Sequence, residues 1–264
     1  MIANFVANVV GKLYPAWCGK FKPRLAERWA EFVNCPKRLE AEGPFLLSLL
    51  KGNPLRIFDA ATGTGCEAVF LARRGCNVTA NEIDRDLARQ AKQFALGEAV
   101  SIHFTDYNWR DVEKSFEPGS FDVTFILGNS LCLLREEESR HEVARNFRAI
   151  CKSDGAVVVD ERNFAYILRE RREILEGNFR YSGRVMYCGK SIRGRPDIIE
   201  HNHVRFVYED VEHRQVLGYL DMHPFKHGEL VELFRQAGFA TAEIFSDFEP
   251  GYRESADFFT YVFR

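Results

Sequence analysis

The pattern of apolar and polar residues along this 264-residue chain changes between helical and strand-like periods several times. From Pro23 to Leu50, apolar and charged residues alternate at helical spacing, with a break at residues 34–36. Residues 55–60, LRIFDA, form a short apolar run between an Asn-Pro pair and a glycine-rich turn, which is typical of a buried parallel strand. The pattern therefore predicts two helices ahead of the first core strand.

Strand-like and helix-like segments then alternate up to residue 167. Further strands are predicted at 76–82, 100–107, 121–128 and 155–162, and helices at 66–74, 84–96 and about 136–150. Such alternation is typical of a parallel sheet with helices on both faces. From about residue 168 the pattern becomes short polar and apolar alternation with turn residues, which indicates inserted antiparallel strands. A helix at 227–239 and two final strands follow.

The length of the chain fits one large domain with an insertion. We therefore expect an α/β fold: a doubly wound, seven-stranded, mostly parallel sheet with an N-terminal helical cap and an inserted antiparallel β lid. The expected boundaries are 1–50 for the cap, 51–167 for the ligand-binding α/β core, 168–220 for the lid, and 221–264 for the helix and strands that complete the sheet.

Composition and charge narrow the expected partners. The chain is 46% hydrophobic and 28% charged, as ordinary globular proteins are, and its net charge of -2 argues against nucleic acid as a partner. Apolar runs fall short of the ~20 residues that cross a bilayer, and the start lacks a basic region before its apolar stretch. We therefore expect a cytoplasmic protein with no membrane partner. We expect most of the seven scattered cysteines to be small buried residues.

The residues after the first strand carry the first candidate chemistry. In FDAATGTG, at 58–65, Asp59 ends the strand, and Gly63 and Gly65 form a tight turn where a ligand can approach the backbone. The spacing differs from the GxGxxG of dinucleotide enzymes, and no GK[ST] is present to hold a triphosphate. Glu82, at the end of the second strand, can accept hydrogen bonds from two ribose hydroxyls. These residues favour a loop that binds an adenosine ligand. The alternative is a generic glycine turn with no ligand.

The end of the third strand, TDYNW at 105–109, favours a methyl donor over a nicotinamide cofactor. Asn108 is placed to pair with an adenine edge and Trp109 to stack beside it, although a core aromatic is an equally good interpretation of Trp109.

Two further strand ends suggest an acceptor site. Gly128 and Asn129, in LGNS at 127–130, follow the fourth strand, where open α/β sheets bind ligands; a helix cap is the alternative. Arg162 ends the fifth strand and faces the same crevice. Its guanidinium fits a carboxylate with two parallel hydrogen bonds, and the competing interpretation is a surface salt bridge with Asp160 or Glu161.

The histidines suggest a metal site only weakly. His201 and His203 would share one face of a strand, but no further ligand completes a site. We expect no metal, and we regard His223 and His227 as candidate pocket residues.

The chain resembles class I S-adenosylmethionine-dependent methyltransferases, and among them the family of glycine N-methyltransferase and glycine sarcosine N-methyltransferase. The resemblance runs from about Trp29 to the C-terminus, and its most specific parts are FDAATGTG, YNW at 107–109, LGNS, and DERNFAYIL at 160–168. It implies an N-methyltransferase for a small amino acid of the glycine, sarcosine or dimethylglycine type. The implied donor is S-adenosyl-L-methionine, the implied product is S-adenosyl-L-homocysteine, and the amine would displace the sulfonium methyl directly.

The resemblance also implies roles for individual residues. Arg38 would hold the methionine carboxylate of the donor. The implied donor-binding residues are Trp29, Arg38, Ala60, Gly63, Gly65, Glu82, Ile83, Asp106, Asn108, Trp109 and Leu127. The implied catalytic residues are Gly128, Asn129 and Arg162, and the implied acceptor-binding residues are Phe32, Asn129, Arg162 and Tyr187.

Two departures from the family pattern concern the acceptor. Leu133 stands where the family has His, and Phe32 where it has Tyr, so the acceptor site is expected to be more apolar. The alternatives are a methyltransferase acting on another small carboxylate-bearing metabolite at O, S or N, a non-catalytic S-adenosylmethionine-binding protein and, last, a dehydrogenase. The N-terminal segment is expected to be either a lid over the active site or the contact of a homo-oligomer.

Overall fold

The structure, a computed structural model, describes residues 23–50, 55–179 and 191–264. The candidate pocket residue Tyr187 and the N-terminal segment, expected to be a lid or an oligomer contact, lie outside the described residues.

The core is a large sheet in which five neighbouring strands run parallel. These strands are β1 (Arg56–Asp59), β2 (Asn77–Asn81), β3 (His103–Thr105), β4 (Phe121–Ile126) and β5 (Cys151–Arg162). The C-terminal strands are β9 (Ala242–Ser246), β10 (Glu249–Pro250) and β11 (Phe258–Phe263), with β11 inserted antiparallel between β5 and β9. In the described part of the chain the strand order is β10-β9-β11-β5-β4-β1-β2-β3. It contains the expected seven strands and one more, β10, a two-residue edge strand that no periodicity could reveal.

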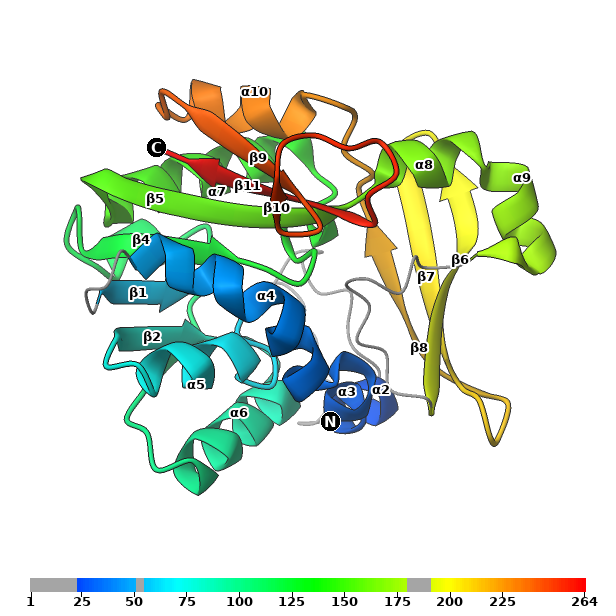
Figure 1. The fold of residues 1–264 in the computed structure, drawn as a ribbon, viewed down its shortest axis with the longest axis horizontal. Helices are drawn as coiled ribbons and strands as arrows, with labels where there is room; N and C mark the ends of the chain where they lie inside the picture. The colour runs from blue at the N-terminus through cyan, green and yellow to red at the C-terminus, as the bar shows by residue number, and fades with distance from the viewer. Residues whose placement is uncertain (1–22, 51–54, 180–190) are drawn as a thin grey trace, which may run out of the picture.

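Helices cover both faces of this sheet (Figure 1). Successive strand residues point to opposite faces, so Ile57 packs against α4 (Cys35–Leu50) and α5 (Cys66–Ala72), whereas Phe58 packs on the side of α7 (Glu137–Ile150) and α10 (Glu229–Gln236). Next to α5 lies α6 (Arg85–Gly97), and short 3-10 turns form η1 (Val112–Lys114) and η2 (Leu131–Leu133). The expected doubly wound α/β fold is confirmed.

The N-terminal cap consists of α2 (Pro23–Glu27), α3 (Trp29–Val33) and α4. The predicted break falls at Asn34, which ends α3. Its φ of 44° is left-handed, and its N–H donates to the carbonyl of Ala30. Figure 1 shows α2 and α3 between the core and a second, smaller sheet. The cap therefore contacts both parts of the molecule.

The second sheet is antiparallel and contains β6 (Ile192–Glu200), β7 (His203–Asp210) and β8 (Gln215–Met222). The lid was expected to be stranded from residue 168, and this expectation is wrong for its first part. Residues up to 178 form α8 (Phe164–Arg169), α9 (Arg171–Glu173) and η3 (Ile174–Asn178). Helix α8 begins at Phe164 because the Oδ1 of the preceding Asn163 accepts the N–H of Tyr166. Phe164 and Ile167 bury one face of this helix.

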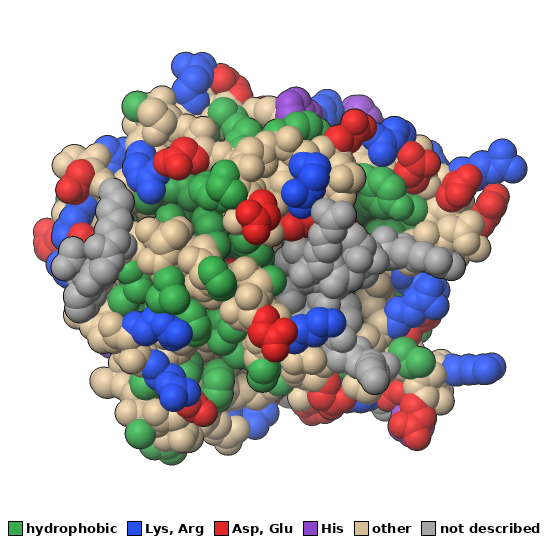
Figure 2. All heavy atoms as spheres, viewed as in Figure 1, with side chains coloured by type: hydrophobic (Ala, Val, Ile, Leu, Met, Phe, Trp, Pro, Cys, Tyr) green, Lys and Arg blue, Asp and Glu red, His purple; other side chains and the backbone are tan. Residues whose placement is uncertain are grey.

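Acidic and basic side chains are interspersed over the face of the molecule in Figure 2. Among the helices that the structure describes, none combines the length and apolarity needed to span a bilayer.

Candidate active site

A pocket lies at the carboxyl ends of β1, β2, β4 and β5, and the cap and the second sheet form its remaining walls. It brings together most of the residues expected in the site: Trp29, Phe32, Arg38, Ala60, Gly63, Glu82, Ile83, Trp109, Leu127, Gly128, Asn129 and Arg162. Gly65, Asp106 and Asn108 lie outside its lining. Residues that the sequence analysis expected from separate strand ends therefore share one cavity.

The two glycines of the first loop are required for different reasons. Gly63 has a φ of 55°, and a Cβ at this position would meet nothing within 4 Å, so its backbone borders open space in the pocket. Gly65 has a φ of 89°, and a Cβ there would lie 3.1 Å from the Cβ of Ala91. The second glycine thus allows α5 to approach α6.

Glu82 holds the glycine loop and faces the pocket. Its Oε2 accepts the N–H of Gly63 and its Oε1 accepts the N–H of Asp84, both at 2.9 Å. Burial raises the pKa of Glu82 to about 7. Each carboxylate oxygen can accept more than one hydrogen bond, so these contacts leave acceptor capacity for ribose hydroxyls. With the open backbone at Gly63, this residue fits an adenosine-containing donor.

Trp109 satisfies both interpretations of the sequence. Its Nε1 donates to the carbonyl of Ala60 at 2.7 Å, and its ring packs against Phe147 with centroids 5.5 Å apart, as a core residue would. It also lines the pocket. Asn108 instead uses its Oδ1 to accept the N–H of Arg110, and Asp106 is exposed.

Asn81 is a pocket residue that sequence reasoning missed. Its Nδ2 donates to the carbonyls of Ala60 and Tyr107, and its Oδ1 accepts from Tyr107 N–H and the Thr105 hydroxyl. One amide thereby ties together the ends of β1, β2 and β3. No signal in the sequence marked it, because β2 also contains the polar residues Asn77 and Thr79.

A buried ion cluster joins the cap to the core at the part of the pocket lined by the end of β1 and the start of α5. Arg38 is 7% exposed; its Nε lies 2.6 Å from Oε2 of Glu42, and it also pairs with Glu67. Burial, together with the charge of Glu67, keeps the pKa of Glu42 well above its usual range despite the pairing with Arg38. Burial and Glu67 likewise raise the pKa of Asp59 to about 7.

The loop after β4 is fixed by Asp160, another residue that the sequence analysis did not place in the site. Gly128 and Asn129 both have positive φ, 73° and 63°, and their N–H groups donate to the two carboxylate oxygens of Asp160 at 2.9 and 2.5 Å. Successive N–H groups in such a turn form a nest for an anion. Asp160 therefore holds the loop in a conformation that a non-glycine residue rarely adopts.

The side chain of Asn129 is engaged within the protein. Its Oδ1 accepts the backbone N–H of Arg162 at 3.0 Å, and its Nδ2 lies 3.1 Å from Sδ of Met222. The neighbouring Ser130 hydroxyl donates to the carbonyl of Leu127, and η2 begins without a side-chain cap. Asn129 thus connects the β4 loop, the end of β5 and the end of β8.

Arg162 is buried, at 6% exposure, so the alternative of a surface salt bridge does not hold. Its guanidinium carbon lies 4.5 Å from the ring centroid of Phe206 and 5.1 Å from that of Phe258. Ring stacking fixes the plane of a guanidinium without using its in-plane N–H donors. The residue lines the pocket in a geometry that suits carboxylate recognition.

Apolar side chains form the wall beside Arg162. The rings of Trp29, Phe32 and Tyr208 contact one another with centroids 4.9 to 5.4 Å apart, and all three line the pocket. Leu133 and Met222 also face it. Tyr208 and Met222 were missed because the alternation of a strand does not reveal which face meets the core.

The candidate histidines have acid partners or aromatic neighbours away from this lining. His203 is paired with Asp221 and His223 with Glu229, each at 2.6 Å, and His227 packs against Tyr252. Among the residues that the structure describes, no group of three or more His, Cys, Asp and Glu is arranged to hold a metal ion.

Comparisons with known proteins define the class. A family model described as a methyltransferase domain matches residues 57–155. An S-adenosylmethionine-dependent methyltransferase from Clostridium acetobutylicum superposes with a TM-score of 0.68 at 12% identity, covering 85% of this chain and 91% of that one. A second, from Bacteroides fragilis in complex with S-adenosyl-L-homocysteine, gives 0.53 at 16% identity, covering 83% and 76%. This chain is an S-adenosylmethionine-dependent methyltransferase with the class I fold.

A curated relative points further, to the kind of reaction. The glycine/sarcosine N-methyltransferase of Aphanothece halophytica is 29% identical over 238 residues, which cover 89% of this chain and 86% of that protein. The similarity supports S-adenosylmethionine-dependent N-methylation of an amino acid.

Proposed function

We propose that this methyltransferase transfers the sulfonium methyl to the amine of a small amino acid of the glycine, sarcosine or dimethylglycine type. The observation that carries the proposal is Arg162, a buried guanidinium stacked between Phe206 and Phe258 at the wall of the pocket. A buried, oriented guanidinium matches the carboxylate that every α-amino acid carries. The curated relative named above acts on such amino acids, according to its name.

The donor half of the pocket suits S-adenosylmethionine. The backbone of Gly63 and the carboxylate of Glu82 would hold the adenosine part, with Trp109 and Leu127 beside it. Arg38, held in place by Glu42 and Glu67, would meet the methionine carboxylate. When bound, the donor supplies a methyl group already activated by its positive sulfur.

The protein's own contribution would be positioning and exclusion of water. Arg162 would hold the acceptor carboxylate so that the amine nitrogen faces the methyl, and the rings of Trp29, Phe32 and Tyr208 would keep water out. The nitrogen–carbon bond forms as the sulfur–carbon bond breaks. An amine near its pKa can lose its proton to solvent before the attack, so no strong general base is required.

The test is substitution Arg162→Ala with labelled donor and glycine, sarcosine or dimethylglycine as acceptor. Removing the guanidinium should raise the KM for the acceptor by about ten-fold to a hundred-fold, the usual effect of losing a charged hydrogen bond, with little change in donor Kd. Arg205→Ala is the matched control, because Arg205 pairs with Asp197 outside the pocket lining. An unchanged acceptor KM in Arg162→Ala would rule out the amino-acid assignment.

A second candidate keeps the donor and changes the nucleophile. The amide of Asn129 is engaged within the protein, and Leu133 and Met222 make the wall beside it apolar, which would also suit another small carboxylate-bearing acceptor with O, S or N as nucleophile. Mass spectrometry of products from a mixed pool of amino acids and other small carboxylates separates the two. We also propose that the enzyme works in the cytoplasm. Its donor supports this location, because S-adenosylmethionine is a metabolite made inside cells.

A further inference from the structure

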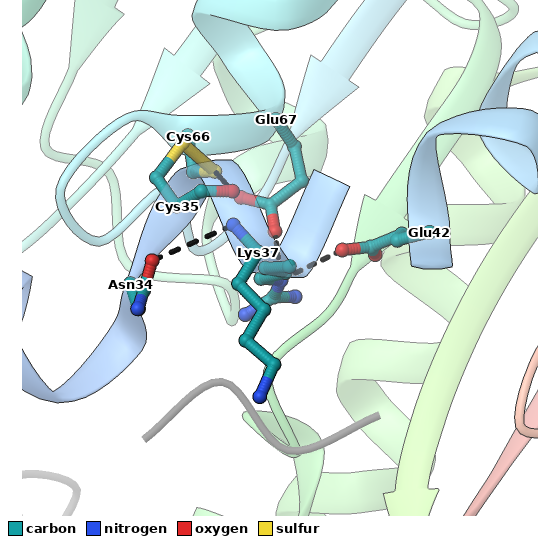
Figure 3. Close-up of a disulfide and its surroundings, with 7 residues drawn as sticks. Asn34, Cys35, Lys37, Glu42, Cys66 and Glu67 are labelled. Atoms are coloured by element: carbon teal, nitrogen blue, oxygen red, sulfur yellow. Dashed lines mark hydrogen bonds and ion pairs between the residues drawn. A yellow bond between two sulfur atoms is a disulfide. The ribbon is translucent and has the colours of Figure 1, made fainter. Parts of the chain in front are cut away.

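A disulfide between Cys35 and Cys66 links the cap to the core, although the sequence analysis expected buried thiols. The two residues are 31 positions apart in the sequence, with Cα atoms 5.6 Å apart. Cys35 begins α4 and Cys66 begins α5, so the bond joins the first residues of two helices (Figure 3). No short spacing motif marks the pair, so the sequence offered no signal for it.

The disulfide adjoins the donor half of the pocket. Cys66 follows Gly65 directly and lines the pocket, and Cys35 precedes Arg38 by three residues. Glu67 lies next to the bond in Figure 3 and Glu42 lies farther from it, and both pair with the guanidinium of Arg38. One covalent bond and one ion cluster therefore hold the same contact between the cap and the glycine loop.

Beside the disulfide, the contact between the cap and the α5–α6 pair contains open space. A second cavity lies between α3–α4 and α5–α6, and both cysteines of the disulfide line it, together with Asn34, Phe70 and Gln90. Cys35 is half-buried, whereas Cys66 is only 2% exposed. A small thiol that enters this cavity can therefore approach the sulfur of Cys35 more easily than that of Cys66.

The other cysteines that the structure describes are less reactive toward small thiols and disulfides. Cys76, Cys132 and Cys151 are buried free thiols. Burial raises the thiol pKa of Cys132 well above its ordinary value and that of Cys151 to about 11. Thiols of raised pKa carry little thiolate and react slowly.

We propose that Cys35 and Cys66 form a reversible redox modification site that controls donor binding. In the oxidised form the bond holds α3 and the start of α4, with Trp29, Phe32 and Arg38, against the glycine loop. In the reduced form the ion cluster, the hydrogen bond from Gln90 to the carbonyl of Ala26 and the apolar packing of α4 on α5 remain. Without the covalent bond, α3 and the start of α4 spend part of their time away from the pocket. The proposal concerns the donor side, so it does not depend on which acceptor is methylated.

The chemistry is thiol–disulfide exchange with a low-molecular-weight thiol. Its thiolate attacks the Sγ of Cys35, the protein S–S bond breaks, and Cys66 leaves as a thiolate that takes up a proton. A second thiol molecule then displaces Cys35, so that two thiols are oxidised to one small disulfide while the protein gains two cysteine thiols. The reverse reaction uses a low-molecular-weight disulfide as the oxidant.

The experiment is calorimetric titration of S-adenosyl-L-homocysteine into the full chain in two states. One sample is treated with oxidised glutathione and the other with dithiothreitol, and peptide mapping after alkylation records whether Cys35 and Cys66 are joined. If the reduced cap is closed for about a tenth of the time, the Kd should rise about ten-fold on reduction.

Two variants sharpen the result. Cys35→Ser should bind the product as weakly as the reduced wild type and should not respond to dithiothreitol. Cys151→Ser removes a buried free thiol at the start of β5, at the opposite end of this strand from the pocket, and should keep the full response. The reduced wild type needs no substitution, so the test stands even if Cys35→Ser folds poorly. The proposal is overturned if the oxidised sample contains no Cys35–Cys66 link, or if linked and reduced protein have the same Kd.

Discussion

At the scale of single residues, Asp160 is the group on which the geometry around Arg162 depends. Its two oxygens hold the N–H groups of Gly128 and Asn129, and Asn129 in turn holds the backbone of Arg162. Asp160 is buried, and burial raises its pKa. It acts on the reaction through other residues, so we regard it as a positioning residue.

Asp160→Asn should lower kcat. The amide keeps one accepting oxygen and places an NH₂ group against an N–H donor, so one main-chain group loses its partner and the loop loses its fixed conformation. We expect kcat to fall by about ten-fold to a hundred-fold, the effect of leaving one buried donor unsatisfied, with a smaller change in donor Kd. Steady-state kinetics and donor titration measure the two effects.

Asp122→Asn is the matched control for this variant, because Asp122 accepts from Arg56 N–H at the opposite end of the sheet. Its kcat should stay near wild type. An Asp160→Asn enzyme with normal kcat and a lowered Tm would show that Asp160 serves stability alone.

At the scale of elements, the two glycines of the first loop have different roles. Gly63 borders the pocket, whereas Gly65 allows α5 to pack against α6. Gly65→Ala would place a methyl group 3.1 Å from the Cβ of Ala91 at a φ of 89°, so α5 and α6 must move apart. Gly63→Ala meets open space at a φ of 55° but fills part of the pocket. We expect Gly65→Ala to cost about 1–3 kcal/mol of stability and Gly63→Ala to cost less.

Donor binding should show the opposite order for the two variants. Gly63→Ala should weaken binding of S-adenosyl-L-homocysteine more than Gly65→Ala does, because only the first adds a methyl group to the pocket. Thermal melts and titration of the two variants measure this pair of effects. Equal losses of stability and of affinity in both would contradict the division of roles.

The sequence predicted the elements well wherever a long period could be followed. The β-α-β alternation from residue 55 to 162 was recognisable because short segments with buried apolar residues, as in β4 and β5, alternate with amphipathic helices such as α6 and α7. The helices between residues 164 and 178 were missed because α8 is only six residues long and depends on a cap by Asn163. The two residues of β10 are too few for a periodic signal.

The candidate site was predictable only in part, for a related reason. Residues at strand ends, such as Glu82 and Arg162, were expected to meet because parallel strands end at one edge of a sheet. Asn81, Asp160 and the Cys35–Cys66 bond act through partners far away in the sequence. Such partners cannot be assigned until the chain is folded.

At the scale of the whole molecule, three units meet at one pocket: the carboxyl edge of the large sheet, the N-terminal cap and the second sheet. To build this pocket the fold buries carboxylic acids at a cost that depends on pH. Burial raises the pKa of Asp59 and Glu82 to about 7 and that of Glu161 to about 8. In an unfolded chain these groups titrate near their ordinary values of about 4.

The folded protein therefore binds more protons than the unfolded chain between about pH 4 and pH 8. Stability falls as pH rises through this window, because ionising these groups is easier in the unfolded chain. Acids whose pKa is lowered, such as Asp210 and Glu232, contribute stability that is lost only as pH falls below about 4, so they do not alter the trend. We expect the Tm of the ligand-free protein to fall by several degrees from pH 5.5 to pH 8.5.

Thermal melts across this range test the expectation, and Glu161→Gln is the informative variant. Glu161 accepts the hydroxyl of Tyr261 at 2.8 Å and lies outside the pocket lining, and glutamine keeps an oxygen that can accept the same bond. Removing one titrating group should make the Tm less dependent on pH without changing donor affinity. A Tm that stays constant or rises toward pH 8.5 in the wild type would show that the buried carboxylates are compensated by charges elsewhere in the fold.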